Sequence, residues 1–106
     1  MSEEELALYD ILTKPAPELS DKEVSQVKQA CRELLETLKK EKLVLDWRKK
    51  ERARSDVRRT LERIFDRHLP ESYGEDIYEE KCEVAYRHIY SSYYGGGQSL
   101  YRQVAS

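Results

Sequence analysis

The side chains in this sequence that most often carry chemistry are two histidines, two cysteines and several runs of carboxylates. Neither His68 nor His88 has a partner at metal-ligand spacing, and the sequence contains no GxxxxGK[ST], GxGxxG, HExxH or GxSxG pattern. The signatures of phosphate binding, dinucleotide binding, metalloproteases and hydrolases are therefore missing. We expect no catalytic, cofactor-binding or metal-binding residue, and we interpret both histidines as structural.

The cysteines and carboxylates support the same interpretation. Cys31 and Cys82 lie far apart in helical patterns without a CxxC pair, so we expect two reduced thiols. The runs 3–5 and 79–80 are spaced like solvated helix surfaces rather than like an acid–base pair. The triplet 95–97 is interpreted as a helix terminator rather than a phosphate loop, because no capped helix follows it.

Basic residues concentrate around the only tryptophan, Trp47. Residues 46–67 hold nine Lys/Arg against five Asp/Glu, a local charge of +4 in a chain of net charge −2. At 100° per residue, four arginines form a basic stripe on the outer face of the expected helix: Arg48, Arg52, Arg59 and Arg63. The stripe suits DNA-backbone contacts. We favour a solvated face with ion pairs such as Asp56 with Arg59, because acidic residues flank the stripe and no aromatic side chain lies within it.

Lys50 and Arg54 point towards the inner side of the same helix, near Trp47. Their aliphatic stems are expected to cover apolar surface while their charges reach a partner. Semi-buried cations beside an indole predict either a specific carboxylate partner or a cation–π contact.

Two capping boxes predict the first two helices. Ser2-x-x-Glu5 predicts a short helix that ends near Thr13, before the prolines at 15 and 17, with an apolar stripe of Leu6, Tyr9 and either Leu12 or Ala7. Ser20-x-x-Glu23 predicts a long helix whose apolar positions recur at three- and four-residue steps. These positions are Val24, Val27, Cys31, Leu34, Leu35 and Leu38.

Two further long helices are predicted in the second half. Leu43-Val44-Leu45 is interpreted as a buried connector, and Asp46 as the N-cap of a helix reaching about Arg67. Its core face comprises Ala53, Val57, Leu61, Ile64, Phe65 and His68. A loop at 69–74 precedes a helix over about 75–92, whose arc holds Tyr78, Cys82, Ala85, Tyr86, Ile89 and Tyr93. The hydroxyls of these tyrosines place that arc at a core edge or an interface.

Composition favours a small all-α bundle of three long helices plus a short N-terminal one. Charged residues make up 38% of the 106 positions and the mean hydropathy is −0.87, so apolar side chains suffice for one stripe per helix. We expect a single helical domain at 1–94 and a flexible C-terminal tail at 95–106. The N-terminus lacks signal-peptide character, and no apolar run could span a bilayer. These features predict a soluble, cytoplasmic protein without membrane contact.

Four motifs, in order, carry a resemblance to a known family. They are Glu5-Leu6-Ala7-Leu8-Tyr9-Asp10, Leu45-Asp46-Trp47-Arg48-Lys49-Lys50, Tyr78-Glu79-Glu80-Lys81-Cys82 and Tyr90-Ser91-Ser92-Tyr93-Tyr94-Gly95. With Glu51 and Arg54 following the tryptophan, the chain resembles the C-terminal helical domain of the motor and endonuclease (R) subunit of type I restriction-modification enzymes. The resemblance covers nearly the whole chain. At the position before Glu51, where many relatives carry Arg, this chain has Lys50.

The resemblance implies an excised, non-catalytic assembly domain without a cofactor, taken from an ATP-dependent DNA translocase and endonuclease. It implies docking onto the methyltransferase and specificity subunits and contact with the preceding motor domain. Any contact with DNA would be made within the assembled complex. The candidate partner-binding residues are Lys50, Glu51, Arg54, Tyr86, Tyr90 and Tyr93. The alternative is a DNA-backbone module that uses the basic stripe.

Overall fold

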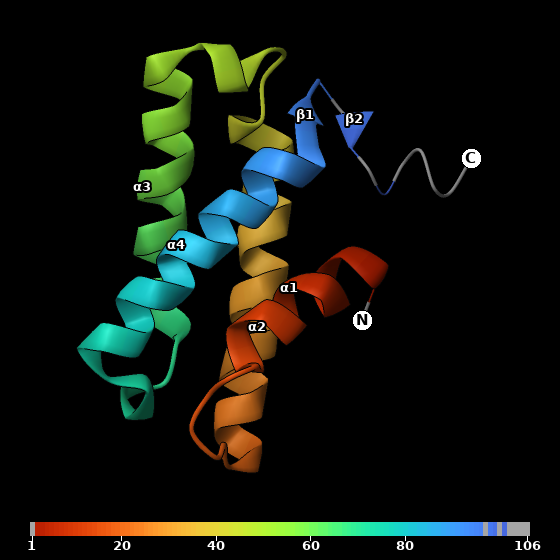
Figure 1. The fold of residues 1–106 in the computed structure, drawn as a ribbon. Helices are drawn as coiled ribbons and strands as arrows, with labels where there is room; N and C mark the ends of the chain where they lie inside the picture. Colours follow the sequence, from red (N-terminus) through yellow and green to blue (C-terminus); the bar gives the residue numbers. More distant parts are fainter. Residues whose placement is uncertain (1, 97, 100, 102–106) are drawn as a thin grey trace.

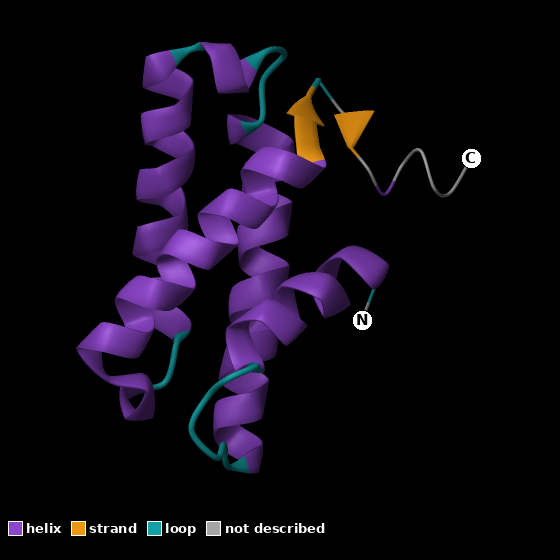
Figure 2. Ribbon diagram, in the orientation of Figure 1, coloured by secondary structure: helices purple, strands orange, loops and turns teal. Residues whose placement is uncertain are grey.

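Four α-helices make up most of the part of the chain that the structure describes (Figure 2). The computed structural model describes residues 2–96, 98, 99 and 101. The helices are α1 (Glu3–Thr13), α2 (Asp21–Thr37), α3 (Glu51–His68) and α4 (Gly74–Ser92). The prediction of an all-α bundle with one short and three long helices is confirmed.

Five short elements connect or follow these helices. A π-helical turn, η1 (Leu38–Lys42), continues α2, and two 3₁₀ turns, η2 (Trp47–Lys49) and η3 (Glu71–Tyr73), precede α3 and α4. After α4, β1 (Tyr93–Gly95) pairs antiparallel with β2 (Gln98–Ser99). Tyr93 is opposite Ser99, and Gly95 is opposite Gln98. This two-stranded ribbon lies beside the connector between η1 and η2 (Figure 1).

The core lies where the four helices meet. In Figure 1, α2 packs against α1 and α3, while α4 runs obliquely across the bundle and contacts α1 and α3. Each helix contributes one apolar stripe, as expected for a charged sequence. Residues with no exposed surface include Leu8, Leu12, Val27, Leu34, Leu38, Trp47, Val57, Leu61, Phe65 and Ile89.

Both predicted capping boxes are present. The hydroxyl oxygens of Ser2 and Ser20 accept the backbone N–H of Glu5 and Glu23, and each glutamate accepts the backbone N–H of its serine. These bonds satisfy amide donors that would otherwise lack partners at a helix start. They fix where α1 and α2 begin, as the sequence predicted.

The apolar stripe predicted for α1 was partly wrong. Leu6 is 49% exposed, whereas Leu8 and Leu12 are fully buried and Tyr9 packs at the core edge. In so short a helix, the leucines at 6, 8 and 12 allow two alternative apolar faces, one through Leu6 and the other through Leu8 and Leu12. Only the packing of α1 against α2 and α4 selects the arc through Leu8 and Leu12.

The predicted entry to α3 was also wrong. Asp46 does not cap the helix: it adopts a left-handed conformation (φ 58°) and makes no capping bond. The chain then forms η2, becomes extended at Lys50, and begins α3 at Glu51. The connector is only partly buried, because Leu43 lies in the core while Val44 and Leu45 are 45% and 66% exposed.

The end of α4 agrees with the predicted bound, but the glycine triplet does not form it. The helix stops at Ser92, and Gly95, the first glycine of the triplet, is the last residue of β1. Of the tail predicted to be flexible, positions 95, 96, 98, 99 and 101 are described; Gly97, Leu100 and 102–106 lie outside the described residues. The division into a domain at 1–94 and a tail at 95–106 stays a prediction.

Candidate functional site

Trp47 anchors the junction between η2, α4 and β1. Its indole is fully buried, and Nε1 donates a hydrogen bond to the backbone oxygen of Tyr93 at 3.0 Å. The rings of Tyr86 and Tyr90 meet the indole edge to face, with centroids 6.4 and 5.9 Å away. The indole thus combines apolar burial with a satisfied polar group.

A glycine allows the last described segment to close over this tryptophan. A Cβ atom at Gly95 would lie 2.2 Å from the backbone oxygen of Val44 and 3.0 Å from Cδ1 of Trp47. The backbone N–H of Gly96 donates to the oxygen of Leu43 at 3.1 Å. The connector and the end of the chain are therefore in direct backbone contact, which only glycine at position 95 permits.

A row of two arginines and three tyrosines lies on the surface above Trp47. The guanidinium of Arg48 lies 5.4 Å from the ring centroid of Tyr90 and 5.0 Å from that of Tyr94. Its Nη1 also donates to the backbone oxygen of Tyr90 at 3.0 Å. Arg58 continues the row, 5.3 Å from the ring centroid of Tyr86. We call Arg58, Tyr86, Tyr90, Arg48 and Tyr94 the Arg–Tyr row.

Further polar contacts hold the row in place. Arg58 pairs with Glu83 on α4 at 2.8 Å, and this guanidinium keeps the pKa of the Glu83 carboxyl below its usual value. Arg54 Nη1 donates to the backbone oxygen of Arg48 at 2.7 Å. The predicted carboxylate or cation–π partner of Arg54 is thus replaced by a backbone carbonyl, so Arg54 fixes η2 against α3.

The other predicted partner-binding residues differ in how much of their side chain is exposed to solvent. Lys50 and Glu51 are exposed where α3 begins, and the expected apolar contact of the Lys50 stem stays a prediction. Tyr86 is half-buried and Tyr90 is 41% exposed. Tyr93 is buried and has no surface to offer a partner.

The basic stripe does not include Arg48. Because η2 and the extended Lys50 interrupt the helix, Arg48 leaves the helical phase and joins the Arg–Tyr row instead. Arg52, Arg59 and Arg63 remain exposed on α3. Arg59 lies 4.0 Å from Asp56, which is the exposed ion pair that the sequence suggested.

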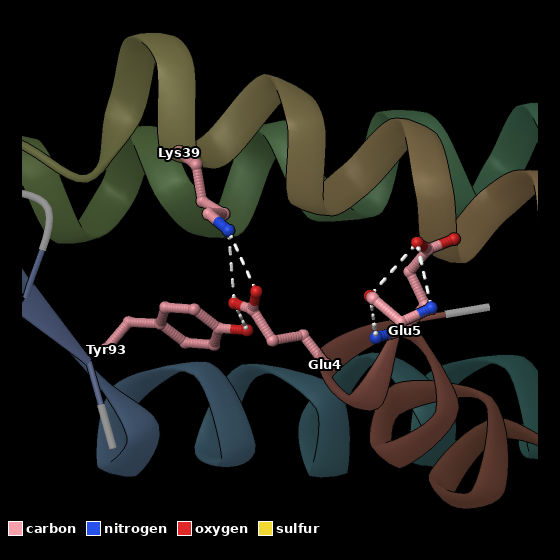
Figure 3. Close-up of polar contacts among 5 residues, drawn as sticks. Glu4, Glu5, Lys39 and Tyr93 are labelled. Carbon is pink, nitrogen blue, oxygen red and sulfur yellow. Dashed lines mark hydrogen bonds and ion pairs between the residues drawn. The ribbon is translucent and has the colours of Figure 1, made fainter. Parts of the chain in front are cut away.

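A polar cluster joins α1, η1 and β1 (Figure 3). The Glu4 carboxylate accepts hydrogen bonds from Nζ of Lys39, at 2.9 and 3.2 Å, and from the hydroxyl of Tyr93 at 2.8 Å. Burial and the neighbouring carboxylate raise the pKa of the Tyr93 hydroxyl. Because this phenol stays protonated and donates to Glu4, the cluster links α1, η1 and β1 rather than offering a base.

Two buried donors from the second half of the chain cap the end of α1. Nζ of Lys81 donates to the oxygen of Ile11 at 3.0 Å, and the hydroxyl of Tyr73 donates to the oxygen of Leu12 at 2.7 Å. Both side chains are at most 2% exposed, and burial lowers the pKa of Lys81 and raises that of Tyr73. These bonds satisfy carbonyls that a helix end leaves unpaired.

The two histidines contact neighbouring side chains, and the two cysteines are buried. His68 pairs with Glu33 on α2, and His88 faces the hydroxyl of Tyr101 at 3.2 Å, with its pKa lowered by burial. Cys31 and Cys82 are buried free thiols, as predicted, and burial raises their pKa values to about 12 and about 11. Thiols protonated near neutral pH are poor nucleophiles and poor metal ligands.

The described part of the chain contains neither a metal-binding cluster nor a membrane-spanning helix. Within it, no group of three or more His, Cys, Asp and Glu side chains is arranged to hold a metal ion. None of its helices combines the length and the apolar character needed to cross a membrane. The arrangement that stands out is therefore the Arg–Tyr row, with Trp47 beneath it. Sequence reasoning missed Arg58, Tyr94 and the surface role of Arg48, because these contacts join separate elements.

Comparison with known families identifies the relatives of this chain. A family model described as type I restriction enzyme HindI endonuclease subunit-like, C-terminal, matches residues 1–89. No curated protein and no solved structure gives a significant match. The match covers most of the chain, including α1, α2, α3, Trp47 and nearly all of α4. The chain therefore belongs to the family of C-terminal domains of HindI-like type I restriction enzyme endonuclease subunits.

Proposed function

We propose that this domain is a non-catalytic assembly module that docks the motor and endonuclease subunit onto the methyltransferase core of a type I restriction enzyme. The observation that carries the proposal is the Arg–Tyr row on the α3–α4 face. Tyrosine, tryptophan and arginine supply most binding hot spots in protein interfaces. Membership of an endonuclease-subunit family supplies the setting.

The row suits docking because its side chains are already ordered. Arg48 is held between two rings and by the Tyr90 carbonyl, while Arg58 is held by Glu83 and the Tyr86 ring. Ordering a long side chain on binding costs roughly 0.5–1.5 kcal/mol, and preorganisation avoids that cost. The fully buried indole beneath the row also supplies a rigid base.

The direct test is binding of the 106-residue chain to its cognate methyltransferase–specificity complex, measured by biolayer interferometry. We expect Arg58→Ala and Tyr86→Ala each to weaken binding by about tenfold or more, as hot-spot truncations do. Excess wild-type chain should also slow DNA cleavage by the intact enzyme, because it competes for the docking site.

Arg63→Ala provides the matched control. Arg63 is another arginine of α3 but lies outside the row, so we expect its removal to change affinity by less than about twofold, the usual effect of a near-neutral contact. Circular dichroism and thermal unfolding establish that each variant is folded. The proposal fails if the wild-type chain does not bind the core, or if Arg58→Ala and Arg63→Ala have equal effects.

A second candidate function is binding of the DNA backbone, which the exposed side chains of Arg52, Arg59 and Arg63 on α3 favour. Each phosphate contact should contribute about 0.9 to the slope of log affinity against log salt concentration. Titrating a short duplex at two salt concentrations therefore tests it. A triple alanine variant should flatten the slope by roughly two to three. Absence of binding at low salt, or binding without salt dependence, contradicts this candidate.

A further inference from the structure

An exposed aliphatic pair lies at the end of the bundle where α2 gives way to α3. Leu45 is 66% exposed and Val44 is 45% exposed, although both lie in a three-residue apolar run. Large hydrophobic side chains exposed in the described part of the chain are Leu6, Val44, Leu45 and Tyr90. Val44 and Leu45 are neighbours in the connector between η1 and η2, whereas Leu6 lies on α1 and Tyr90 on α4. We call Val44 and Leu45 the apolar tip.

The apolar tip rests on a rigid base. The backbone N–H of Gly96 donates to the oxygen of Leu43. A Cβ atom added to Gly96 would lie 3.1 Å from Cδ1 of Leu45, so the Leu45 side chain lies close to this glycine. Trp47 N–H donates to the oxygen of Val44 at 3.0 Å, so the backbone on both sides of Leu45 is hydrogen-bonded. Leu45 is therefore presented to solvent by a fixed backbone and packs against the β1–β2 turn.

Basic residues concentrate in the segment that carries the apolar tip. Positions 39–54 hold eight Lys/Arg against three Asp/Glu, a charge of +5, whereas the rest of the chain carries −7. The ammonium group of Lys39 is hydrogen-bonded to the Glu4 carboxylate, and the guanidinium of Arg48 lies over the rings of Tyr90 and Tyr94. Exposed cations of the segment include Lys40, Lys49, Lys50 and Arg52, which we call the basic collar.

We propose that the apolar tip and the basic collar form one docking surface, whose occupant is an acidic protein surface with an apolar side chain at its centre. The inference rests on the proposed function, and it places the occupant on the methyltransferase–specificity complex. Complementary charges steer association, while the central apolar contact supplies affinity. Exposed Leu and Val favour a protein over a DNA backbone, because phosphates and sugars give branched aliphatic groups little to pack against.

The experiment compares two leucines of similar exposure in the full 106-residue chain. Leu45→Asp places a carboxylate in the apolar tip, and Leu6→Asp does the same on α1, outside the tip. Affinity for the methyltransferase–specificity complex is measured by interferometry, and folding by circular dichroism. We expect Leu45→Asp to weaken binding by about tenfold or more, and Leu6→Asp by less than about twofold.

A second pair tests the charge. Lys49→Glu changes the basic collar, and Arg63→Glu changes an exposed cation elsewhere. We expect Lys49→Glu to lower the association rate more than Arg63→Glu does, and the wild-type rate to fall as salt rises, because steering is screened. A short DNA duplex serves as the competing probe under the same conditions.

The outcomes separate the two levels of the proposal. Absence of binding by the wild-type chain overturns the proposed function and the surface with it. Normal wild-type binding with equal losses for Leu45→Asp and Leu6→Asp overturns the surface alone. Loss of duplex binding in Leu45→Asp and Lys49→Glu, with binding to the core unchanged, assigns the surface to nucleic acid and also overturns the inference.

Discussion

Trp47→Ala is expected to lower the free energy of unfolding by about 3–5 kcal/mol, the range for emptying a large buried aromatic site. The indole has no exposed surface, contacts the rings of Tyr86 and Tyr90, and holds the backbone of Tyr93 through Nε1. Its removal leaves a cavity and takes the indole donor away from the Tyr93 carbonyl at the same place. The Arg–Tyr row above it should loosen as well.

Urea denaturation followed by circular dichroism measures this loss, because Trp47 is the only tryptophan and its fluorescence disappears with it. Trp47→Phe separates the two causes: it retains an aromatic ring but removes the donor to Tyr93. We expect Trp47→Phe to cost about 1–3 kcal/mol, since the buried Tyr93 carbonyl loses the indole donor and a smaller void remains. A loss below about 1 kcal/mol for Trp47→Ala would contradict the anchoring role.

Gly95→Ala is expected to cost at least about 2 kcal/mol, although it adds a single methyl group. The position has φ +95°, which L residues rarely adopt, and the new Cβ would lie 2.2 Å from the oxygen of Val44. That atom belongs to the backbone of the connector and cannot rotate away. Relief requires β1 to move off Trp47, which also strains the bond between its Nε1 and Tyr93.

Gly96→Ala is the matched control for Gly95→Ala. Gly96 also has a positive φ, +59°, but the nearest atom to its added Cβ is Cδ1 of Leu45, at the end of a flexible side chain. We therefore expect about 1–2 kcal/mol, the cost of a left-handed residue alone. Chemical denaturation of both variants tests the difference. Equal losses would show that close packing against Val44 contributes nothing beyond backbone conformation.

The sequence was most informative where local chemistry decides structure. Ser2 with Glu5 and Ser20 with Glu23 located two helix starts, because a capping box needs only residues three apart. Long apolar periodicity likewise located α2, α3 and α4. The entry to α3 was missed because Asp46 is a favoured capping residue that also tolerates the left-handed conformation found here.

The candidate site was harder to predict because its contacts join separate elements. Arg48 was placed on the outer face of a continuous helix, and three residues of η2 changed its direction entirely. Its partners Tyr90 and Tyr94 lie more than forty positions later, a separation that periodicity within one helix cannot bridge. Burial of Tyr93 and exposure of Leu45 depend similarly on how β1 closes against the connector.

The Tyr93 carbonyl that holds Trp47 has a practical consequence for where this domain can be cut. The family match ends at residue 89, yet three contacts that close the structure involve residues 93–95. The carbonyl of Tyr93 accepts the indole N–H, its hydroxyl donates to Glu4, and Gly95 packs against Val44. A fragment trimmed to the matched residues would expose Trp47 to solvent. The folding unit therefore extends beyond the boundary that family resemblance marks, and expression designs should retain at least β1 and β2.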